Sequence, residues 1–304
     1  MRRIFAVLMI VVILLTFPIS VSAQDVKQSD GDYYDHEETG VTIPYRLILP
    51  EVYDDKYVFP LVVFFHGAGE RGYENEHQLD NCVQQIANNM PKAIILVPQC
   101  SHGNQWVDTP WSEGCYSVDE VPESDELMAV MSLVDQIKQD YSVDDQMVYA
   151  MGISMGGFAV WDVMVRHNDV FAAGVAVCGG GDPSKAEILK DTPMFVYHGT
   201  ADDTVPLSGS ADTVAAIEAA GGTKVQYEEF EGVGHGIWGQ VFNLKDMYKN
   251  VQRCKLSDHY TPPQPQTDPP AQKPNNWLLP TLIFGGIGVL ALVMVILIIP
   301  KKKK

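Results

Sequence analysis

The stretch VYAMGISMGGFAVW, residues 148–161, decides the fold of this chain. It contains a short apolar run, a serine between two glycines and a helix-like segment without proline, in that order. This order is typical of a sharp strand-to-helix turn, in which the central residue takes strained backbone angles and the glycines let the helix pass close to the strand. Such a turn exposes the Ser154 hydroxyl at the carboxyl edge of a sheet, where it can act as a nucleophile.

Two segments farther along the chain supply a candidate acid and a candidate base. Residues 193–206, PMFVYHGTADDTVP, combine an apolar strand pattern with a loop that carries carboxylates. Residues 225–231, VQYEEFE, predict another strand, and the glycine loop at 232–236 behind it holds a histidine. Serine, aspartate and histidine follow one another in the α/β-hydrolase order. An ordinary serine in a glycine-rich turn is the alternative, and it is weakened by the presence of both partners.

The chemistry assigns a role to each of these residues. Ser154 needs a base within hydrogen-bond reach, and only an imidazole readily accepts and returns a proton near neutral pH, so we expect His235 to be that base. A carboxylate holds the imidazole in one tautomer and stabilises its cationic form, and we expect Asp202 to do so. Asp203 is the alternative, because spacing alone does not exclude it.

A second apolar strand ends in a glycine loop nearer the N-terminus. Residues 57–65, YVFPLVVFF, run into HGAGERG at 66–72, whose glycines let the backbone fold close to a ligand. We expect the oxyanion hole here, formed by the backbone amide of Ala68 together with that of Met155, the residue after the nucleophile. A plain strand-to-loop turn beginning at His66 is the alternative.

These motifs resemble those of the bacterial secreted α/β-hydrolases labelled predicted peptidases, over roughly residues 40–255. That group is similar to the prolyl-oligopeptidase catalytic domain, the dienelactone hydrolases and the phospholipase/carboxylesterase group. The resemblance implies serine hydrolase activity. Dienelactone hydrolases place cysteine where this chain has Ser154, which argues against their chemistry. No β-propeller precedes the motifs, so the size filter that restricts prolyl oligopeptidases to peptides is missing. The resemblance therefore implies ester substrates in preference to peptides. The matching motifs are HGAGERG at 66–72, PQC at 98–100, GISMGG at 152–157, VCGGGDP at 177–183, HGTADDTVP at 198–206 and Gly234-His235.

Strand and helix patterns alternate along the chain, which predicts an α/β-hydrolase fold with a mostly parallel central sheet and helices on both faces. The candidate active-site loops then meet at the carboxyl ends of the strands. We expect strands at 42–49, 61–65, 93–98, 147–151, 173–178, 194–198 and 225–231, and helices at 124–141, directly after Ser154, at 208–220 and at 237–254.

Both ends of the chain carry membrane-targeting patterns. Two arginines, an apolar run and small residues up to Ala23 predict a secretory signal, with an uncleaved anchor as the alternative. At the other end an apolar stretch followed by four lysines predicts a transmembrane helix with a cytoplasmic tail. A cell-wall sorting signal competes with this interpretation, but LPTLI at 279–283 lacks the glycine of LPxTG. The expected parts are a signal peptide at 1–23, an N-terminal segment at 24–40, a catalytic domain at 41–256, a proline-rich linker at 257–276, a transmembrane helix at 277–300 and a lysine tail at 301–304.

The irregular, aromatic segment 98–122 is the candidate for one side of the substrate pocket. Tryptophan rings there can stack on sugars, although they serve as often as core or loop anchors. His198, at the end of a strand, is expected to be structural. The candidate substrate-binding residues are Trp106, Trp111, Trp238 and Glu70.

Composition limits the partners and cofactors. Outside the signal and the tail, 15 lysines and arginines face 39 aspartates and glutamates, which disfavours nucleic acid and anionic lipid surfaces as partners. The acidic run 33–38 is expected to be a solvated segment and not a metal site. No zinc-type or nucleotide-binding motif is present, so neither a metal nor a cofactor is expected. The oligomeric state stays open.

The five cysteines are an odd number in a chain expected to be exported, so at least one is unpaired within the chain. A bridge between Cys100 and Cys115 would close a long insertion, and free thiols are the alternative. Spacing leaves open the pairing of Cys82, Cys100, Cys115, Cys178 and Cys254.

The sequence therefore predicts a membrane-anchored serine hydrolase whose catalytic domain lies outside the cell. We expect a carboxylesterase that forms an acyl-enzyme at Ser154 and acts on a small-molecule or polysaccharide-linked ester. A serine peptidase of the prolyl-oligopeptidase type is the first alternative. A surface binding module that kept the fold without catalysis is the second.

Overall fold

The computed structural model describes residues 31–262. The expected signal peptide, transmembrane helix and lysine tail, and most of the expected linker, lie outside this range. Within it, no helix is long and apolar enough to cross a membrane. The described residues thus cover the expected catalytic domain and a short stretch on either side of it.

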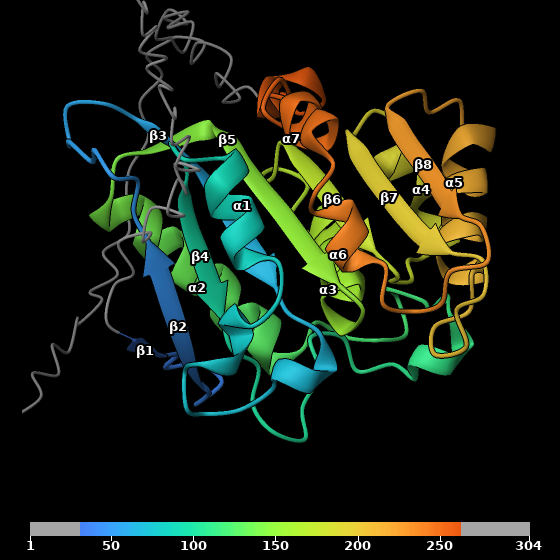
Figure 1. Ribbon diagram of the computed structural model, residues 1–304, viewed down its shortest axis with the longest axis horizontal. Coiled ribbons are helices and arrows are strands. Elements are labelled where there is room, and N and C mark those ends of the chain that lie inside the picture. The colour runs from blue at the N-terminus through green and yellow to red at the C-terminus, as the bar shows by residue number, and fades with distance from the viewer. Residues whose placement is uncertain (1–30, 263–304) are drawn as a thin grey trace, which may run out of the picture. The chain divides into compact units, whose positions relative to one another are not determined.

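One eight-stranded sheet runs through the described part of the chain (Figure 1). The strands are β1 Asp32–Asp35, β2 Thr42–Ile48, β3 Phe59–Phe65, β4 Ile94–Pro98, β5 Val143–Ile153, β6 Ala173–Val177, β7 Met194–Gly199 and β8 Val225–Phe230. Their order in the sheet is β1-β2-β4-β3-β5-β6-β7-β8. The β1–β2 and β2–β4 pairs are antiparallel, and all other pairs are parallel. The mostly parallel sheet confirms the predicted fold class.

Helices cover both faces of the sheet, because the central strands are apolar on both faces. On β3, Leu61, Val63 and Phe65 face one core, and the residues between them face the other. Helices α2 to α5 pack into the first core, and α1, α6 and α7 into the second (Figure 1). The helices are α1 Val83–Asn89, α2 Asp125–Asp140, α3 Met155–Arg166, α4 Ala186–Leu189, α5 Ser208–Ala219, α6 Trp238–Val241 and α7 Lys245–Val251.

The strand order brings the candidate residues to one edge of the sheet. Strands β5, β6, β7 and β8 are neighbours in that order (Figure 1). Parallel strands end at the same edge, so Ser154, which directly follows β5, and Asp202, which lies just beyond β7, come to that edge together. His235 lies in the loop between β8 and α6.

The N-terminal part of the domain differs from the prediction. Strand β1 lies in the segment expected to be solvated, and it pairs with the first half of β2. It is an edge strand with mostly exposed side chains, so its polar sequence concealed it. The Tyr34 hydroxyl, 2.6 Å from Ser132 Oγ on α2, helps to dock it. Helix α1 was also missed, because its short sequence VQQIANN buries only three side chains.

The predicted C-terminal helix 237–254 is wrong as a single helix, since α6 and α7 are separate. Phe242 follows α6, and its carbonyl oxygen accepts a hydrogen bond from the Tyr248 hydroxyl at 3.0 Å. The Asn243 side chain donates back to the Gly239 carbonyl at 2.6 Å. Side chains that bond to nearby backbone in this way compete with helix continuation. Strand β5 is longer than the predicted 147–151. The prediction missed its first half, because that half is polar and partly exposed.

Candidate active site

Ser154 lies between β5 and α3 with a strained backbone. Its φ of 53° and ψ of −121° fall outside the regions that residues with a side chain normally adopt. A Cβ on Gly156 would lie 2.0 Å from the carbonyl oxygen of Phe65, and one on Gly152 would lie 2.2 Å from the carbonyl oxygen of Gly156. Only glycine fits at these two positions, so the tight strand-to-helix turn depends on both of them.

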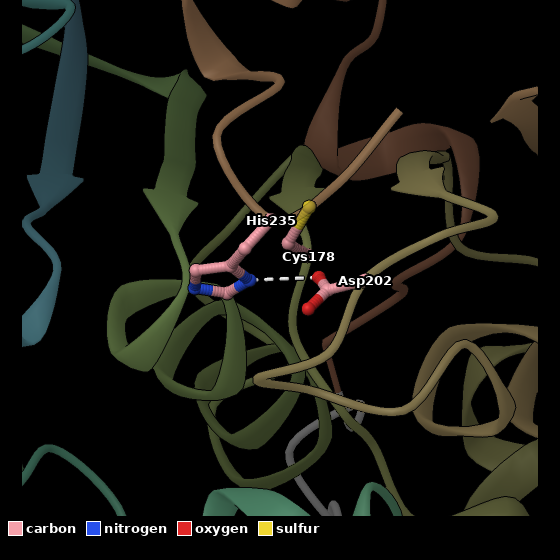
Figure 2. Close-up of side chains that lie close together, drawn as sticks. All are labelled: Cys178, Asp202 and His235. Atoms are coloured by element: carbon pink, nitrogen blue, oxygen red, sulfur yellow. Dashed lines mark hydrogen bonds and ion pairs between the residues drawn. The ribbon is translucent and has the colours of Figure 1, made fainter. Parts of the chain in front are cut away.

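The serine hydroxyl meets the predicted histidine and aspartate. Ser154 Oγ lies 2.7 Å from His235 Nε2. On the other side of the ring, His235 Nδ1 lies 2.7 Å from Asp202 Oδ2 (Figure 2). Because an ionised carboxylate only accepts hydrogen bonds, Nδ1 carries the ring hydrogen of the neutral imidazole. Nε2 is then left to accept the hydrogen of Ser154. This is the arrangement that activates a serine hydroxyl.

Asp202, and not Asp203, faces the histidine. The Oδ1 atom of Asp202 accepts hydrogen bonds from the backbone amides of Thr204 and Val205, both at 2.9 Å. Burial raises the pKa of Asp202, but the hydrogen bond from His235 and the two amides outweigh it and bring the pKa below its usual value. Asp203 is exposed. The buried carboxylate therefore remains ionised beside the imidazole.

The loop expected to form the oxyanion hole is held by the side chain of His66. Its Nδ1 donates to the Gly67 carbonyl oxygen at 2.6 Å, and its Nε2 accepts from the Cys100 amide at 2.9 Å. Complete burial lowers the pKa of His66 to about 4, so the ring is neutral at neutral pH. The Trp106 indole donates to the His66 carbonyl oxygen at 3.1 Å. Sequence analysis did not assign this role to the imidazole.

The two amides expected to bind the oxyanion lie next to Ser154. The Ala68 N–H belongs to the Gly67–Ala68 peptide, whose carbonyl oxygen accepts the hydrogen bond from His66 Nδ1. No described peptide bond is cis, so the Ala68 N–H points away from the side on which His66 binds the carbonyl. A Cβ on Gly67 would lie 3.6 Å from Ser154 Cβ, which puts this peptide beside the nucleophile. Met155 is the first residue of α3, where amides lack a helical partner.

Two candidate substrate-binding residues are turned into the protein. Trp106 is completely buried and packs edge-on against Phe65, with ring centroids 5.5 Å apart, so it offers no face to a sugar. Glu70 accepts a hydrogen bond from the Asn81 side chain, and its Oε2 is buried with no hydrogen-bond partner among the described residues. Burial raises the pKa of Glu70. The structure corrects the expectation for Trp106. Glu70 is partly exposed, and a Cβ on Gly67 would lie 3.1 Å from its Oε2 and 3.6 Å from Ser154 Cβ, so a role at the site stays a prediction.

The other two candidate substrate-binding residues are half-buried, one against the candidate base and one against an arginine of the oxyanion loop. The Trp238 ring meets the His235 ring edge-to-face, with centroids 5.4 Å apart. The Arg71 guanidinium stacks over Trp111, with its Cζ 5.8 Å from the ring centroid. Arg71 Nε donates to the Ala68 carbonyl oxygen at 2.9 Å. Trp111 is thus connected to the oxyanion loop, and Trp238 to the candidate base.

Cys178, which the sequence analysis did not assign to the site, lies beside Asp202 and His235 (Figure 2). The three potential ligand atoms are within 4.8 Å of one another, which could suit a metal ion. However, the 2.7 Å between His235 Nδ1 and Asp202 Oδ2 is a hydrogen-bond distance, whereas two ligands of one tetrahedral zinc lie about 3.3 Å apart. Burial raises the pKa of the Cys178 thiol to about 12. Cys178 directly follows β6, which is the neighbour of β7 in the sheet, and this strand order brings it to Asp202.

All five cysteines lie among the described residues, and all are free thiols. Cys100 is completely buried, and its amide binds the His66 ring. Cys115 is half-buried, with its Sγ 3.5 Å from the Ser208 carbonyl oxygen. The bridge between Cys100 and Cys115 is therefore absent, because the two side chains have different surroundings.

Comparison with known proteins finds esterases. A bifunctional acetylxylan esterase/xylanase of Neocallimastix patriciarum is 37% identical over 155 residues, which are 48% of this chain and 20% of that protein. The crystal structure of a thermostable esterase has a TM-score of 0.65 at 30% identity and covers 74% of this chain and 63% of that chain. A ferulic acid esterase, with a TM-score of 0.54 at 19% identity, covers 74% of this chain and 98% of that chain and shares the fold.

The chain spans less than half the length of the curated relatives it matches. Esterases among the relatives and the structural neighbours favour an esterase over a peptidase. The family model described as phospholipase/carboxylesterase matches residues 52–255, which is well over half of the chain. The chain therefore belongs to the phospholipase/carboxylesterase family of α/β-hydrolases.

Proposed function

We propose that this protein is a serine carboxylesterase that works through a Ser154–His235–Asp202 triad and an acyl-enzyme. The observation that carries the proposal is the continuous chain of two 2.7 Å contacts from Ser154 Oγ through the imidazole to Asp202. The strained elbow supports it as well, because backbone strain of this kind is kept at functional sites.

The reaction follows from this geometry. Ser154 Oγ attacks the ester carbonyl carbon while its proton passes to His235 Nε2. The amides of Ala68 and Met155 stabilise the oxyanion, and removal of one such donor typically costs about 100- to 1,000-fold in rate. The intermediate collapses, the alkoxide leaves with the proton from His235, and the acyl group stays on the serine. Water then attacks the acyl-enzyme, with His235 as its base, and the acid is released.

Acylated carbohydrate is the substrate class we favour. Trp111 and Trp238 are half-buried aromatic side chains, connected through Arg71 to the oxyanion loop and directly to the base. Aromatic faces bind sugar rings and aryl groups with little loss of side-chain entropy. The relative that is 37% identical is named an acetylxylan esterase/xylanase, which fits this choice.

A substrate panel tests the function. The purified protein is incubated with aryl esters, acetylated and feruloylated sugars, and a peptide library, with Ser154→Ala as the matched control. We expect ester turnover that is abolished in S154A, with sugar esters preferred. Defined peptide cleavage with little ester turnover would instead support a peptidase. No turnover by the wild type on any arm would support a binding module.

We also propose that the domain acts outside the cell, tethered by the apolar segment before the four lysines. The support is the sequence pattern, since a basic cluster next to a transmembrane helix stays in the cytoplasm. A membrane-impermeant serine-hydrolase probe, applied to intact expressing cells, should label the protein. Labelling only after lysis would contradict the location and leave the reaction untouched.

A further inference from the structure

His198 is the second-last residue of β7, four residues before Asp202, and it is completely buried. Its Nε2 lies 3.1 Å from the Val205 carbonyl oxygen and 3.2 Å from Asp202 Oδ2. Both of these atoms are hydrogen-bond acceptors, so Nε2 must carry a hydrogen. The imidazole N–H of His198 therefore bonds to the Val205 carbonyl oxygen, and the same nitrogen lies 3.2 Å from the carboxylate oxygen that binds His235.

Ser210 of α5 contacts the ring from its other side. Its Oγ lies 2.8 Å from His198 Nδ1 and 2.9 Å from the Gly179 carbonyl oxygen. Burial lowers the pKa of His198, which favours the neutral ring. A neutral ring with its hydrogen on Nε2 can only accept at Nδ1, so the one hydrogen of the Ser210 hydroxyl has two acceptors within reach, Nδ1 and the Gly179 carbonyl oxygen. The ring is thus oriented by a helix that packs behind the sheet.

The two oxygens of Asp202 are held differently. Oδ1 accepts two hydrogen bonds from rigid backbone amides of its own loop. Oδ2 is contacted by the side chains of His235, which is 17% exposed, and of His198, which is not exposed at all. His198 is therefore the fixed neighbour of Oδ2, and His235 is the neighbour that must gain and lose a proton.

We propose that His198 is a positioning residue for the catalytic triad, whose Nε2–H keeps Asp202 Oδ2 directed at His235 Nδ1. This inference rests on the proposed function, because it needs the pair of Asp202 and His235 to act in catalysis. By sharing the negative charge of Oδ2, His198 also limits how strongly Asp202 stabilises the His235 imidazolium. The other titratable group at this carboxylate is the thiol of Cys178.

Two substitutions with side chains of similar length distinguish the effect of the His198 N–H donor from the effect of side-chain size. Glutamine in His198→Gln puts an amide N–H near the position of Nε2, whereas methionine in His198→Met has no donor. In both variants the Ser210 hydroxyl can still donate to Gly179. Thr213→Val, also buried on α5, removes one hydrogen bond at a distance from the triad and is the control for lost stability.

The measurements are kcat and KM on a short acyl p-nitrophenyl ester, the pH dependence of kcat/KM, and the melting temperature. For H198M we expect kcat to fall on the order of tenfold with KM unchanged, because two amides still hold Asp202. The acidic limb of kcat/KM, on which the free enzyme's base becomes protonated, should move to higher pH. H198Q should restore both towards the wild type, and T213V should change neither.

The proposal is overturned if H198M matches T213V in kcat and in the acidic limb, or if H198Q is as impaired as H198M. Should H198M fail to fold, His198→Asn replaces it, because asparagine keeps the contact with Ser210 but cannot reach Asp202, and the same results apply. A wild type whose turnover survives Ser154→Ala refutes the proposed function itself. That outcome is separate from any result on His198.

Discussion

The nucleophile side of the site and the acid–base side are built by different means. At the ends of β3 and β5, backbone packs on backbone: a Cβ on Gly156 would meet the Phe65 carbonyl oxygen at 2.0 Å, and the Ser154 amide donates to the Val177 carbonyl oxygen at 2.8 Å. Beyond β7 and β8, the reacting groups are positioned by side chains, namely Asp202, His198 and His235.

The two sides should therefore respond differently to substitution. Backbone packed on backbone does not tolerate even a methyl group, because a Cβ on Gly156 would clash with the Phe65 carbonyl oxygen. Side-chain hydrogen bonds can be weakened one at a time, and each affects charge as well as position. We therefore expect substitutions on the nucleophile side to act on folding and those on the acid–base side to act on rate.

The largest effect is expected for Gly156→Ala, which tests the backbone side. The new Cβ would force β3 and α3 apart, so we expect no soluble folded protein and no activity. Gly239→Ala is the matched control, because nothing lies within 4 Å of a Cβ there. Expression yield and melting temperature are the measurements. A folded, active G156A would refute the claim that packing permits only glycine.

The next largest effect is expected for Asp202→Asn, which tests the side-chain side. An amide in place of the carboxylate favours the wrong tautomer of His235, so kcat should fall by about four orders of magnitude while the fold persists. Asp203→Asn is the control and should leave kcat unchanged, since Asp203 is exposed. Equal losses in the two variants would contradict the assignment of the acid.

A smaller effect, on stability, is expected from the protonation of His66. Burial lowers its pKa from 6.5 to about 4, so between these values the unfolded chain binds the extra proton. The free energy of unfolding should therefore fall as the pH drops from 6.5 to 4, by up to roughly 3 kcal/mol from this group. Glu70, whose pKa burial raises, opposes this trend.

Urea unfolding of the wild type and of His66→Asn at several pH values isolates the contribution of His66. Asparagine does not titrate, so the decline in stability between pH 6.5 and pH 4 should be shallower in H66N. Parallel curves for the two proteins would mean that the buried neutral imidazole is not the cause.

The smallest effect is expected for Trp238→Leu, at the border between the reacting groups and the substrate. Loss of the ring beside His235 should raise KM for aryl and sugar esters and lower kcat slightly, together about fivefold in kcat/KM, which corresponds to about 1 kcal/mol. Trp238→Phe should retain most of the effect. Steady-state kinetics with an unchanged kcat/KM in W238L would exclude Trp238 from the substrate site.

The sequence predicted the elements whose pattern is local and strong. The apolar strands β3 and β4, the elbow glycines and the order of serine, aspartate and histidine are all visible in short windows. The edge strand β1 was missed, because its alternating polar side chains are mostly exposed. The split between α6 and α7 depends on the Tyr248 hydroxyl, which binds a backbone carbonyl.

Within the site, the sequence named the reacting groups but not their supports. Nothing in the spacing of Trp106 predicts that it is buried against His66, and no pattern brings Cys178 to Asp202. These contacts arise from the strand order, which only the folded sheet determines. The choice between Asp202 and Asp203 likewise required the direction of each side chain.

The most direct test of the central claim is labelling with a fluorophosphonate probe, followed by peptide mass spectrometry. We expect one covalent adduct per chain, on Ser154, formed rapidly in the wild type, slowly in D202N and not at all in S154A. An adduct on another residue, or equal labelling of the wild type and S154A, would contradict the account.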